Sequence, residues 1–212
     1  MFMLDYTEYF KIFIGLLAIV DPLAAIPIFI TMTAHETGEH RRKTINTVAF
    51  GMTIILLMTL FLGEYILQFF NITIDSFRVA GGILLLLMAL AMLHARTSPI
   101  RQTSIEANES IEKQEVAIVP LAMPLLAGPG AISTVILAAH RSDDFVHYLV
   151  LAGEILVLSM IVWVFLRLSF WVHRHVSNTG INIFTRIMGL ILAAIAVEFI
   201  ANGVRGLFPV LA

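Results

Sequence analysis

Pro22-Leu-Ala-Ala-Ile-Pro27 and Pro124-Leu-Leu-Ala-Gly-Pro129 decide the fold, because one pattern, P-L-x-A-x-P, recurs inside apolar sequence in both halves of the chain. The two copies lie 102 residues apart (124 − 22) in a chain of 212 residues. A proline inside a helix removes a backbone hydrogen bond and clashes with the carbonyl four residues earlier, at a cost of about 3 kcal/mol. Two such proline pairs at matching positions predict two helices that are broken in the same way.

Other residues repeat in the same order. With the offset of 102, Gly51 aligns with Gly153. With an offset of 108 (186 − 78), Arg78-Val-Ala-Gly81 aligns with Arg186-Ile-Met-Gly189. Such self-similarity along the chain indicates an internal repeat. The glycines in these segments also predict close contact between helices.

The composition predicts that much of the chain lies in lipid. Hydrophobic residues make up 59% of the sequence and charged residues 13%, with a mean hydropathy of +0.92, whereas soluble domains are roughly 45 to 50% apolar. A helix that spans a bilayer needs about 20 apolar residues. Charged and polar clusters divide the sequence into six apolar segments: Tyr9–Thr33, Thr44–Phe70, Phe77–Leu93, Val116–Ala139, Phe145–Trp171 and Ile183–Phe208.

The six segments fall into two halves. Residues 1–95 hold three segments, residues 116–212 hold the other three, and the polar stretch 96–115 is expected to be a cytoplasmic linker. A repeat with an odd number of spans is inserted upside down relative to its partner, as in many secondary transporters. We therefore predict an all-α membrane protein with six transmembrane helices in two inverted three-helix repeats, with helices one and four broken at prolines.

The distribution of positive charge predicts the orientation in a cell inner membrane. The start of the chain has Asp5 and Glu8 before Lys11, the reverse of a signal peptide, so the first segment is expected to be retained. Four Lys and Arg residues lie on the side of the termini, which we expect to be the outer side. They are Lys11, Arg78, Arg141 and Arg205, against Arg41, Arg42, Lys43, Arg96, Arg101, Lys113, Arg167, Arg174 and Arg186 on the cytoplasmic side.

Several classes of function are disfavoured. The net charge is −2 without a long run of either sign, which argues against nucleic-acid binding. The absence of cysteine excludes disulfides and thiolate metal sites, and the sequence contains no nucleotide-binding loop of the G-x-x-x-x-G-K type. We expect no catalytic residues, no metal site and no cofactor, apart from a coupling H⁺ or Na⁺. The oligomeric state stays open.

The proline breaks define the expected substrate site. A broken helix offers N-terminal amide groups to an anion and C-terminal carbonyls to a cation, and the zwitterion of an amino acid needs both. Small residues and a hydroxyl accompany the prolines. The residues expected to bind substrate are Pro22, Ala24, Ala25, Pro27, Pro124, Ala127, Gly128, Pro129, Gly130 and Ser133, together with Asp21.

Two carboxylates are candidates for coupling transport to an ion. Asp21 directly precedes the first break, and a carboxylate at membrane depth is costly enough to suggest a function. It is expected to bind an ammonium group, a proton or Na⁺, or to accept hydrogen bonds from the unwound backbone. Glu198 shares a helix face with Asn202, four residues on. It either lines a polar pathway or lies near the membrane interface.

Four segments together resemble the MarC family of bacterial and archaeal membrane proteins. They are Asp21-Pro22 to Phe29, Phe77-Arg78 to Leu84, Pro124 to Ile132 and Arg186 to Leu192, which occur in this order over essentially the whole chain. The resemblance implies six spans in two inverted halves. By similarity to an archaeal small neutral amino acid transporter of the family, it also implies that glycine-like or alanine-like substrates bind near the two breaks. Members usually have glycine at the position of Ala24 and often glutamine near Glu198.

The sequence thus predicts a secondary transporter of a small solute, with small neutral amino acids such as glycine or alanine as the expected cargo. Alternating access between the two halves is the expected mechanism. Two alternatives stay open. One is an exporter of drugs or metabolites, and the other is a membrane scaffold without transport activity.

Overall fold

A computed structural model describes residues 5–33, 36–94, 126–142, 144–171 and 178–208. Within these ranges the regular structure is helical and contains no strand, which confirms the all-α prediction. Five candidate spans in the described part are long and apolar enough to cross a membrane, and α6 is shorter. The helices are α1 (Tyr6–Val20), α2 (Pro22–Met32), α3 (Gly38–Phe69), α4 (Ile74–Leu93), α6 (Pro129–Ala139), α7 (Phe145–Arg167) and α9 (Asn178–Leu207).

Capping residues explain why some helices begin earlier than the apolar segments. The backbone N–H of His40 donates to the Thr37 hydroxyl at 3.4 Å, so α3 includes the polar turn from Gly38 that hydropathy alone left out. At α4 the N–H of Ser76 donates to the Thr73 hydroxyl at 3.2 Å. Such caps satisfy amide groups that a helix cannot pair internally. The helices therefore extend beyond the lipid-facing stretch on the side where a cap is present.

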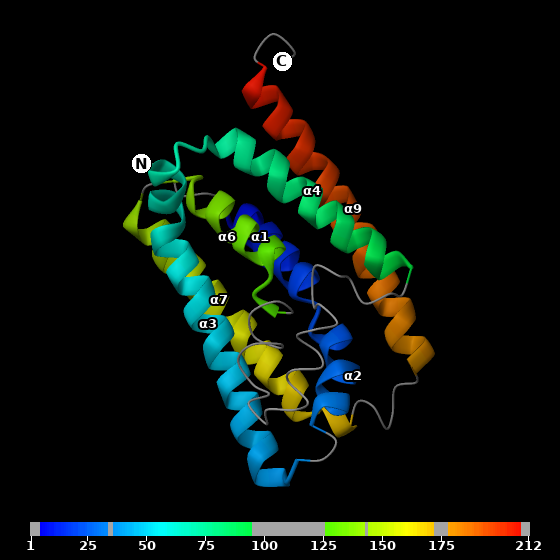
Figure 1. Ribbon diagram of the computed structural model, residues 1–212. Coiled ribbons are helices and arrows are strands. Elements are labelled where there is room, and N and C mark those ends of the chain that lie inside the picture. The colour runs from blue at the N-terminus through cyan, green and yellow to red at the C-terminus, as the bar shows by residue number, and fades with distance from the viewer. Residues whose placement is uncertain (1–4, 34–35, 95–125, 143, 172–177, 209–212) are drawn as a thin grey trace.

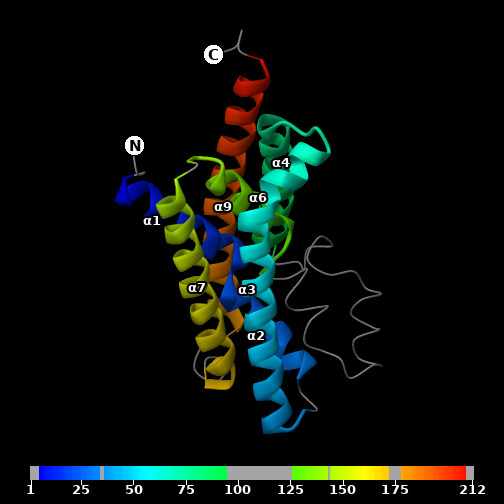
Figure 2. The same cartoon turned by 90° about the vertical axis from the view of Figure 1, so that its left-hand side faces the viewer.

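The helices pack as two pairs with the interrupted helices between them. The most extensive contacts join α4 to α9, and the next join α3 to α7. Figure 1 shows the α4–α9 pair along one flank of the molecule and the α3–α7 pair along the other, with α1 and α6 between them. Seen from the side, the start of α1 and the end of α9 lie toward the same end of the bundle (Figure 2).

Glycines bring α4 and α9 into backbone contact. A Cβ atom added at Gly82 would lie 2.9 Å from the carbonyl oxygen of Ala196, and one at Gly203 would lie 2.9 Å from that of Asp75. At Gly189 the same atom would lie 3.2 Å from the Ala89 carbonyl oxygen. The two helices thus run antiparallel at a separation that larger side chains would prevent. This confirms the packing role predicted for Gly81, Gly82 and Gly189, whereas a Cβ atom at Gly153 would meet nothing within 4 Å, so the predicted close contact was wrong there.

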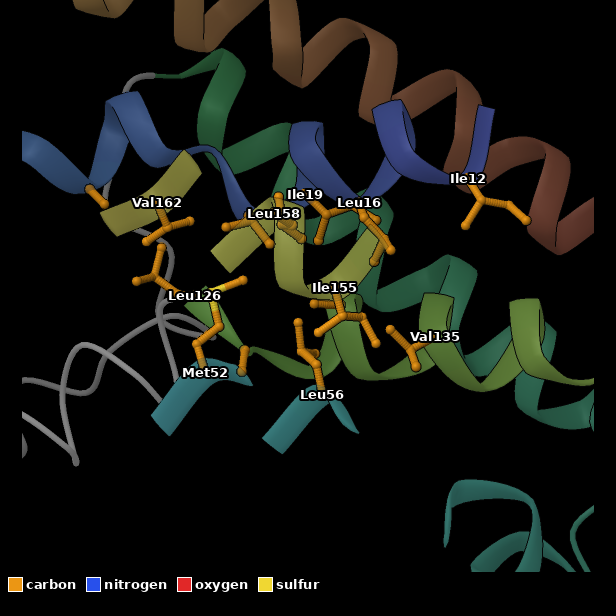
Figure 3. Packing of buried hydrophobic residues seen from close by; sticks show 14 of the residues in the cluster. Ile12, Leu16, Ile19, Met52, Leu56, Leu126, Val135, Ile155, Leu158 and Val162 are labelled. Carbon is orange, nitrogen blue, oxygen red and sulfur yellow. The ribbon is translucent and has the colours of Figure 1, made fainter. Parts of the chain in front are cut away.

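The interrupted helices form the interior of the bundle. The window of the first span, Tyr6–Ile30, is 61% buried, whereas the other four candidate spans are 17 to 33% buried and present large apolar side chains outward. Side chains of α1, α3, α6 and α7 meet in one core, which Figure 3 shows around Leu16, Leu56 and Ile155. Exposed apolar residues on outer helices fit a lipid surround. Pro22 of the first span is therefore buried, and Pro27 and Pro129 are half-buried.

Part of the predicted plan lies outside the described residues. The linker 96–115 belongs to this part, as do Pro120 and Pro124 of the fourth segment. The described portion of that segment begins at Leu126 and continues into α6.

Candidate functional site

The first interruption is made by Asp21. This residue takes the left-handed backbone conformation, with φ 42° and ψ 71°, and separates the end of α1 at Val20 from the start of α2 at Pro22. Aspartate visits this region more readily than most residues with a side chain. Its Oδ1 accepts a hydrogen bond from the N–H of Ala24 at 3.3 Å. Asp21 therefore ends one helix and caps the next, and Pro22 occupies the first helical position, where its missing N–H costs nothing.

Asp21 places its carboxylate deep in the protein. The residue is 1% exposed, and it lies between two helix ends of opposite dipole sign. The carboxylate stands at the positive, N-terminal end of α2, while the carbonyl groups at the negative end of α1 lie on the other side. Of these, Leu17 accepts the N–H of Asp21 at 3.0 Å. The result is an interior region with acceptor groups suited to a cation.

Pro27 does not extend the interruption, in contrast to the prediction that both prolines of the pair break the helix. The chain is helical on both sides of Pro27, from Pro22 to Met32. A proline removes one backbone donor and bends a helix, and a helix continues past it when its other hydrogen bonds persist. The break is thus limited to Asp21, between the end of α1 at Val20 and the start of α2 at Pro22.

The second interruption, as far as the structure describes it, is the start of α6, because the residues before Leu126 lie outside the described ranges. Its construction differs from that of the first. Gly128 caps α6 in extended geometry, with φ −69° and ψ 174°, and provides no side chain to its first turn. Pro129 follows at the first helical position, and the N–H of Ile132 donates to the Gly128 carbonyl at 3.1 Å. No glycine in the described ranges has a positive φ, so Gly128 takes a backbone conformation that other residues can also adopt. The start of α6 presents backbone amides without a capping side chain of its own.

Gly130 permits the two interruptions to approach one another. A Cβ atom at this position would lie 3.3 Å from Cγ2 of Ile19, 2.8 Å from Cδ2 of Leu85 and 3.1 Å from Sδ of Met88. Ile19 is two residues before Asp21, and Gly130 is two residues after Gly128. The C-terminal end of α1, which ends in carbonyl groups, therefore lies beside the N-terminal end of α6, which begins with amide groups.

The other residues predicted at the site surround these two ends. Next to Ser133, the hydroxyl of Thr134 donates to the Gly130 carbonyl at 2.9 Å within its own helix, as threonine hydroxyls in helices commonly do. The Cβ of Ser133 lies 2.9 Å from the position of a Cβ on Gly81 of α4. Pro124 lies outside the described residues. The remaining predicted positions are buried at Pro22, Ala25 and Ala127 and half-buried at Ala24 and Pro27.

A pocket lined by charged residues lies between α6 and the first half of α1. Its volume is about 540 Å³. Thr134, five residues after Pro129, forms part of its wall, so the pocket reaches to within about one and a half turns of the α6 start. Glu198 and Asn202, which share one face of α9, both line it. The lining residues are Glu8, Lys11, Ile12, Arg78, Thr134, Leu137, Ala138, Arg141, Ile195, Glu198, Phe199 and Asn202.

Polar contacts fasten the end of α6 to its neighbours. His147 of α7 is 1% exposed. Its Nε2 lies 2.9 Å from the carbonyl oxygen of Ala138, and its Nδ1 lies 2.9 Å from the Tyr9 hydroxyl. Because a carbonyl oxygen is an acceptor, Nε2 carries the proton, and in the neutral ring Nδ1 accepts from Tyr9. Glu8 also accepts from Arg141 at 3.0 Å. These contacts join α1, α6 and α7 beside the pocket.

Comparison with known proteins assigns the family. A family model described as MarC family integral membrane protein matches residues 6–208. The chain belongs to the MarC family. It is similar to the UPF0056 membrane protein YhcE of Escherichia coli, with 43% identity over 97% of this chain and 95% of the relative. No solved structure matches the chain.

Other relatives come from distant organisms. The UPF0056 membrane protein MJ1677 of Methanocaldococcus jannaschii is 41% identical over 96% of this chain and 98% of its own length. The UPF0056 membrane protein YvbG of Bacillus subtilis is 35% identical over 94% of this chain and 95% of its own length. The whole chain therefore corresponds to whole MarC-family proteins rather than to one part of them.

Sequence reasoning missed the polar contacts of this MarC-family chain. It did not single out His147, which lies in the first turn of α7 and is buried among three helices. It counted Arg78 as a positive charge on the side of the termini, and the structure adds that Arg78 lines the charged pocket. Periodicity places a residue on a helix face but does not show which helix covers that face. The sequence offered one signal for this contact: His147 lies just inside the start of one predicted span, and Tyr9 lies at the start of another.

Proposed function

We propose that this protein is a secondary transporter of small neutral amino acids such as glycine or alanine, working by alternating access. The observation that carries the proposal is the meeting of the two interruptions, where Ile19 at the end of α1 packs against Gly130 at the start of α6. The buried carboxylate of Asp21 adds negative charge on the α1 side. Membership of a family of integral membrane proteins supports the setting of this site in a bilayer.

The two ends suit the two charges of an amino acid. In the proposed complex, the substrate carboxylate binds the amides at the start of α6, where Gly128 supplies no competing side chain. The substrate ammonium group binds the carbonyls at the end of α1 and the carboxylate of Asp21. The neighbouring residues Ala24, Ala25 and Ala127 are small and apolar and offer no charged group to a substrate side chain, which favours small neutral amino acids.

We propose that six spans form two inverted three-helix repeats. The pairing of α4 with α9 and of α3 with α7 supports this, because an inverted repeat brings equivalent helices into contact across its axis. The α4–α9 contacts are reciprocal. Gly82 meets Ala196 and Ile200, while Gly189 meets Ala89 and Leu93. When residue numbers are shifted by 108, each of these contacts falls within one residue of the other, so the two halves make equivalent contacts.

We also propose an inner-membrane location with the start of α1 and the end of α9 outside. The distribution of Lys and Arg supports this orientation, and it places the charged pocket on the outer side. Of the two coupling candidates, we assign coupling to Asp21, because it is buried between the helix ends. Glu198 instead lies at the exposed wall of the pocket.

Flux in proteoliposomes tests the function. Purified protein would be assayed with labelled glycine, alanine and serine, with and without imposed gradients of H⁺ and Na⁺. Saturable flux of at least one of these amino acids is expected. An absence of flux for all three, in protein that is folded and correctly inserted, would overturn the proposal.

The variant Asp21→Asn separates coupling from binding. The amide keeps an oxygen that can accept from Ala24, but it loses the charge. If Asp21 carries only the coupling ion, and the α1 carbonyls alone bind the ammonium group, gradient-driven accumulation disappears while exchange of labelled for unlabelled substrate persists. If it binds the ammonium group, both are lost. Glu39→Gln, an exposed carboxylate on α3 paired with Lys43 at 3.1 Å, is the matched control.

A further inference from the structure

The charged pocket contains charges that its own contacts leave available. Glu8 accepts hydrogen bonds from both Lys11 at 2.7 Å and Arg141 at 3.0 Å, so these two cations share one carboxylate. Arg78 contacts Asp75 through one guanidinium nitrogen at 3.4 Å, which leaves most of its five N–H donors free for another acceptor. Among the described residues Glu198 forms no hydrogen bond or ion pair, although the charge of Lys11 lies close enough to attract it.

The packing of α4 on α9 fixes where these two free charges lie. Gly203 approaches the backbone between Asp75 and Val79, since its added Cβ would lie 2.9 Å from the Asp75 oxygen and 3.0 Å from the Val79 nitrogen. Arg78 is therefore level with Asn202, the neighbour of Gly203. Glu198 is four residues away from Asn202 along the helix, an axial offset of about 6 Å. A cationic group and an anionic group thus line the pocket one helical turn apart.

Another part of the wall is apolar. Leu137 of α6 and Ile195 and Phe199 of α9 line the pocket beside Glu198. A volume of about 540 Å³ lies within the range of roughly 300 to 1,000 Å³ found for small-molecule sites. This space exceeds what glycine or alanine needs, and it offers a surface on which a larger apolar side chain can be buried.

The pocket ends before the interruptions. Thr134 lines the pocket and donates to the Gly130 carbonyl, and a Cβ atom at Gly130 would meet Ile19, Leu85 and Met88. Neither Gly130 nor Asp21 lines the pocket. The pocket is therefore a different place from the meeting of the two helix ends.

We propose that the charged pocket is a separate binding site for zwitterionic amino acids with apolar side chains larger than that of alanine. Arg78 and Asn202 bind the carboxylate, Glu198 binds the ammonium group, and the side chain packs on Ile195 and Phe199. The proposal rests on the transport function proposed above. Amino acids such as leucine occupy this site and block the path of alanine, because they are too large to pass into the space between the helix ends.

Binding of labelled L-leucine to purified protein in nanodiscs tests the site directly. We expect saturable binding that falls at least tenfold in Glu198→Gln and in Arg78→Gln. Isoamylamine, which lacks the carboxylate, and 4-methylpentanoate, which lacks the amine, should compete at least tenfold more weakly than leucine. Controls are Glu39→Gln and Arg205→Gln, which change exposed charges outside the pocket and should bind leucine as the unaltered protein does.

A further variant distinguishes loss of the pocket from loss of folding. Phe199→Ala keeps every charge and should weaken leucine binding at least fivefold while changing the binding of glycine less than twofold. The site is overturned if leucine does not bind, or if it binds equally well to Glu198→Gln, Arg78→Gln and Phe199→Ala.

The transport function and the pocket fail in different ways. If leucine binds with the expected dependence but no amino acid is carried into proteoliposomes, the transport proposal fails and the pocket stands. If alanine is carried but leucine neither binds nor inhibits its uptake, the pocket proposal fails and the transport function stands.

Discussion

The two interruptions have a proline at the same place but differ in the residue before it. Asp21 precedes Pro22, takes a left-handed conformation and caps α2 with its own carboxylate. Gly128 precedes Pro129, is extended and gives α6 no capping side chain. One interruption therefore carries negative charge into the interior, and the other leaves amide groups that attract negative charge. The difference makes the pair suitable for a molecule with one charge of each sign.

The largest expected effect is the loss of Asp21. Asp21→Ala removes the charge, the cap and the residue type that tolerates the left-handed conformation. Uptake of alanine should fall at least 100-fold, and the free energy of unfolding should decrease by about 1 to 3 kcal/mol, from the lost cap and the backbone strain. Uptake and thermal unfolding of the same preparations check this. Uptake within threefold of the unaltered protein would show that the first interruption has no part in transport.

The second largest effect is expected when the residue before Pro129 is replaced by aspartate, the residue that precedes Pro22. Gly128→Asp adds a carboxylate that caps α6 and occupies the amides proposed to bind the substrate. We expect uptake to fall about 10- to 100-fold, as for loss of 1.4 to 2.8 kcal/mol of substrate binding, without loss of thermal stability. The control is Thr73→Asp, which exchanges one capping residue for another at the start of α4. Unchanged uptake in Gly128→Asp would contradict the assignment of the carboxylate site.

Packing beside the second interruption should have a smaller effect, on stability first. A methyl group at Gly130 meets Leu85 at 2.8 Å, whereas one at Gly153 of α7 meets nothing within 4 Å. Gly130→Ala should therefore destabilise the protein by about 1 to 3 kcal/mol. Gly153→Ala should be neutral or stabilise it by up to about 1 kcal/mol, through helix propensity. Thermal unfolding of both variants decides, and equal midpoints would refute the close approach of α1, α4 and α6.

The smallest expected effect is at Pro27. Because α2 is helical on both sides of this residue, Pro27→Ala should leave uptake within twofold and should not lower the unfolding midpoint. A tenfold loss of uptake in folded protein would mean that the first interruption extends to Pro27. The conclusion that the first interruption consists of Asp21 alone would then be wrong.

The sequence predicted local structure correctly at positions where few residue types can take the required conformation or contact. Asp-Pro within an apolar segment indicated a helix end and a new helix start, and the structure places both at Asp21 and Pro22. The glycines of α4 and α9 indicated close packing for a similar reason. Long apolar stretches identified the spanning helices within a few residues, although capping at Thr37 extended α3 into polar sequence.

The parts that depend on tertiary contacts could not be predicted. Whether Pro27 breaks a helix depends on the remaining hydrogen bonds of α2, which periodicity does not report. The contact of His147 with Tyr9 joins residues 138 positions apart, and the charged pocket draws its walls from α1, α4, α6 and α9. Its residues have no common spacing along the chain, so only the packing of the helices reveals that they meet.

Competition by substrate analogues that lack one charge tests the central claim most directly. Labelled alanine would be taken up by proteoliposomes in the presence of ethylamine, which lacks the carboxylate, or propionate, which lacks the amine. If the two unlike helix ends bind one charge each, either analogue should inhibit at least 100-fold more weakly than unlabelled alanine. Inhibition by ethylamine or by propionate at the concentration effective for alanine would contradict the account.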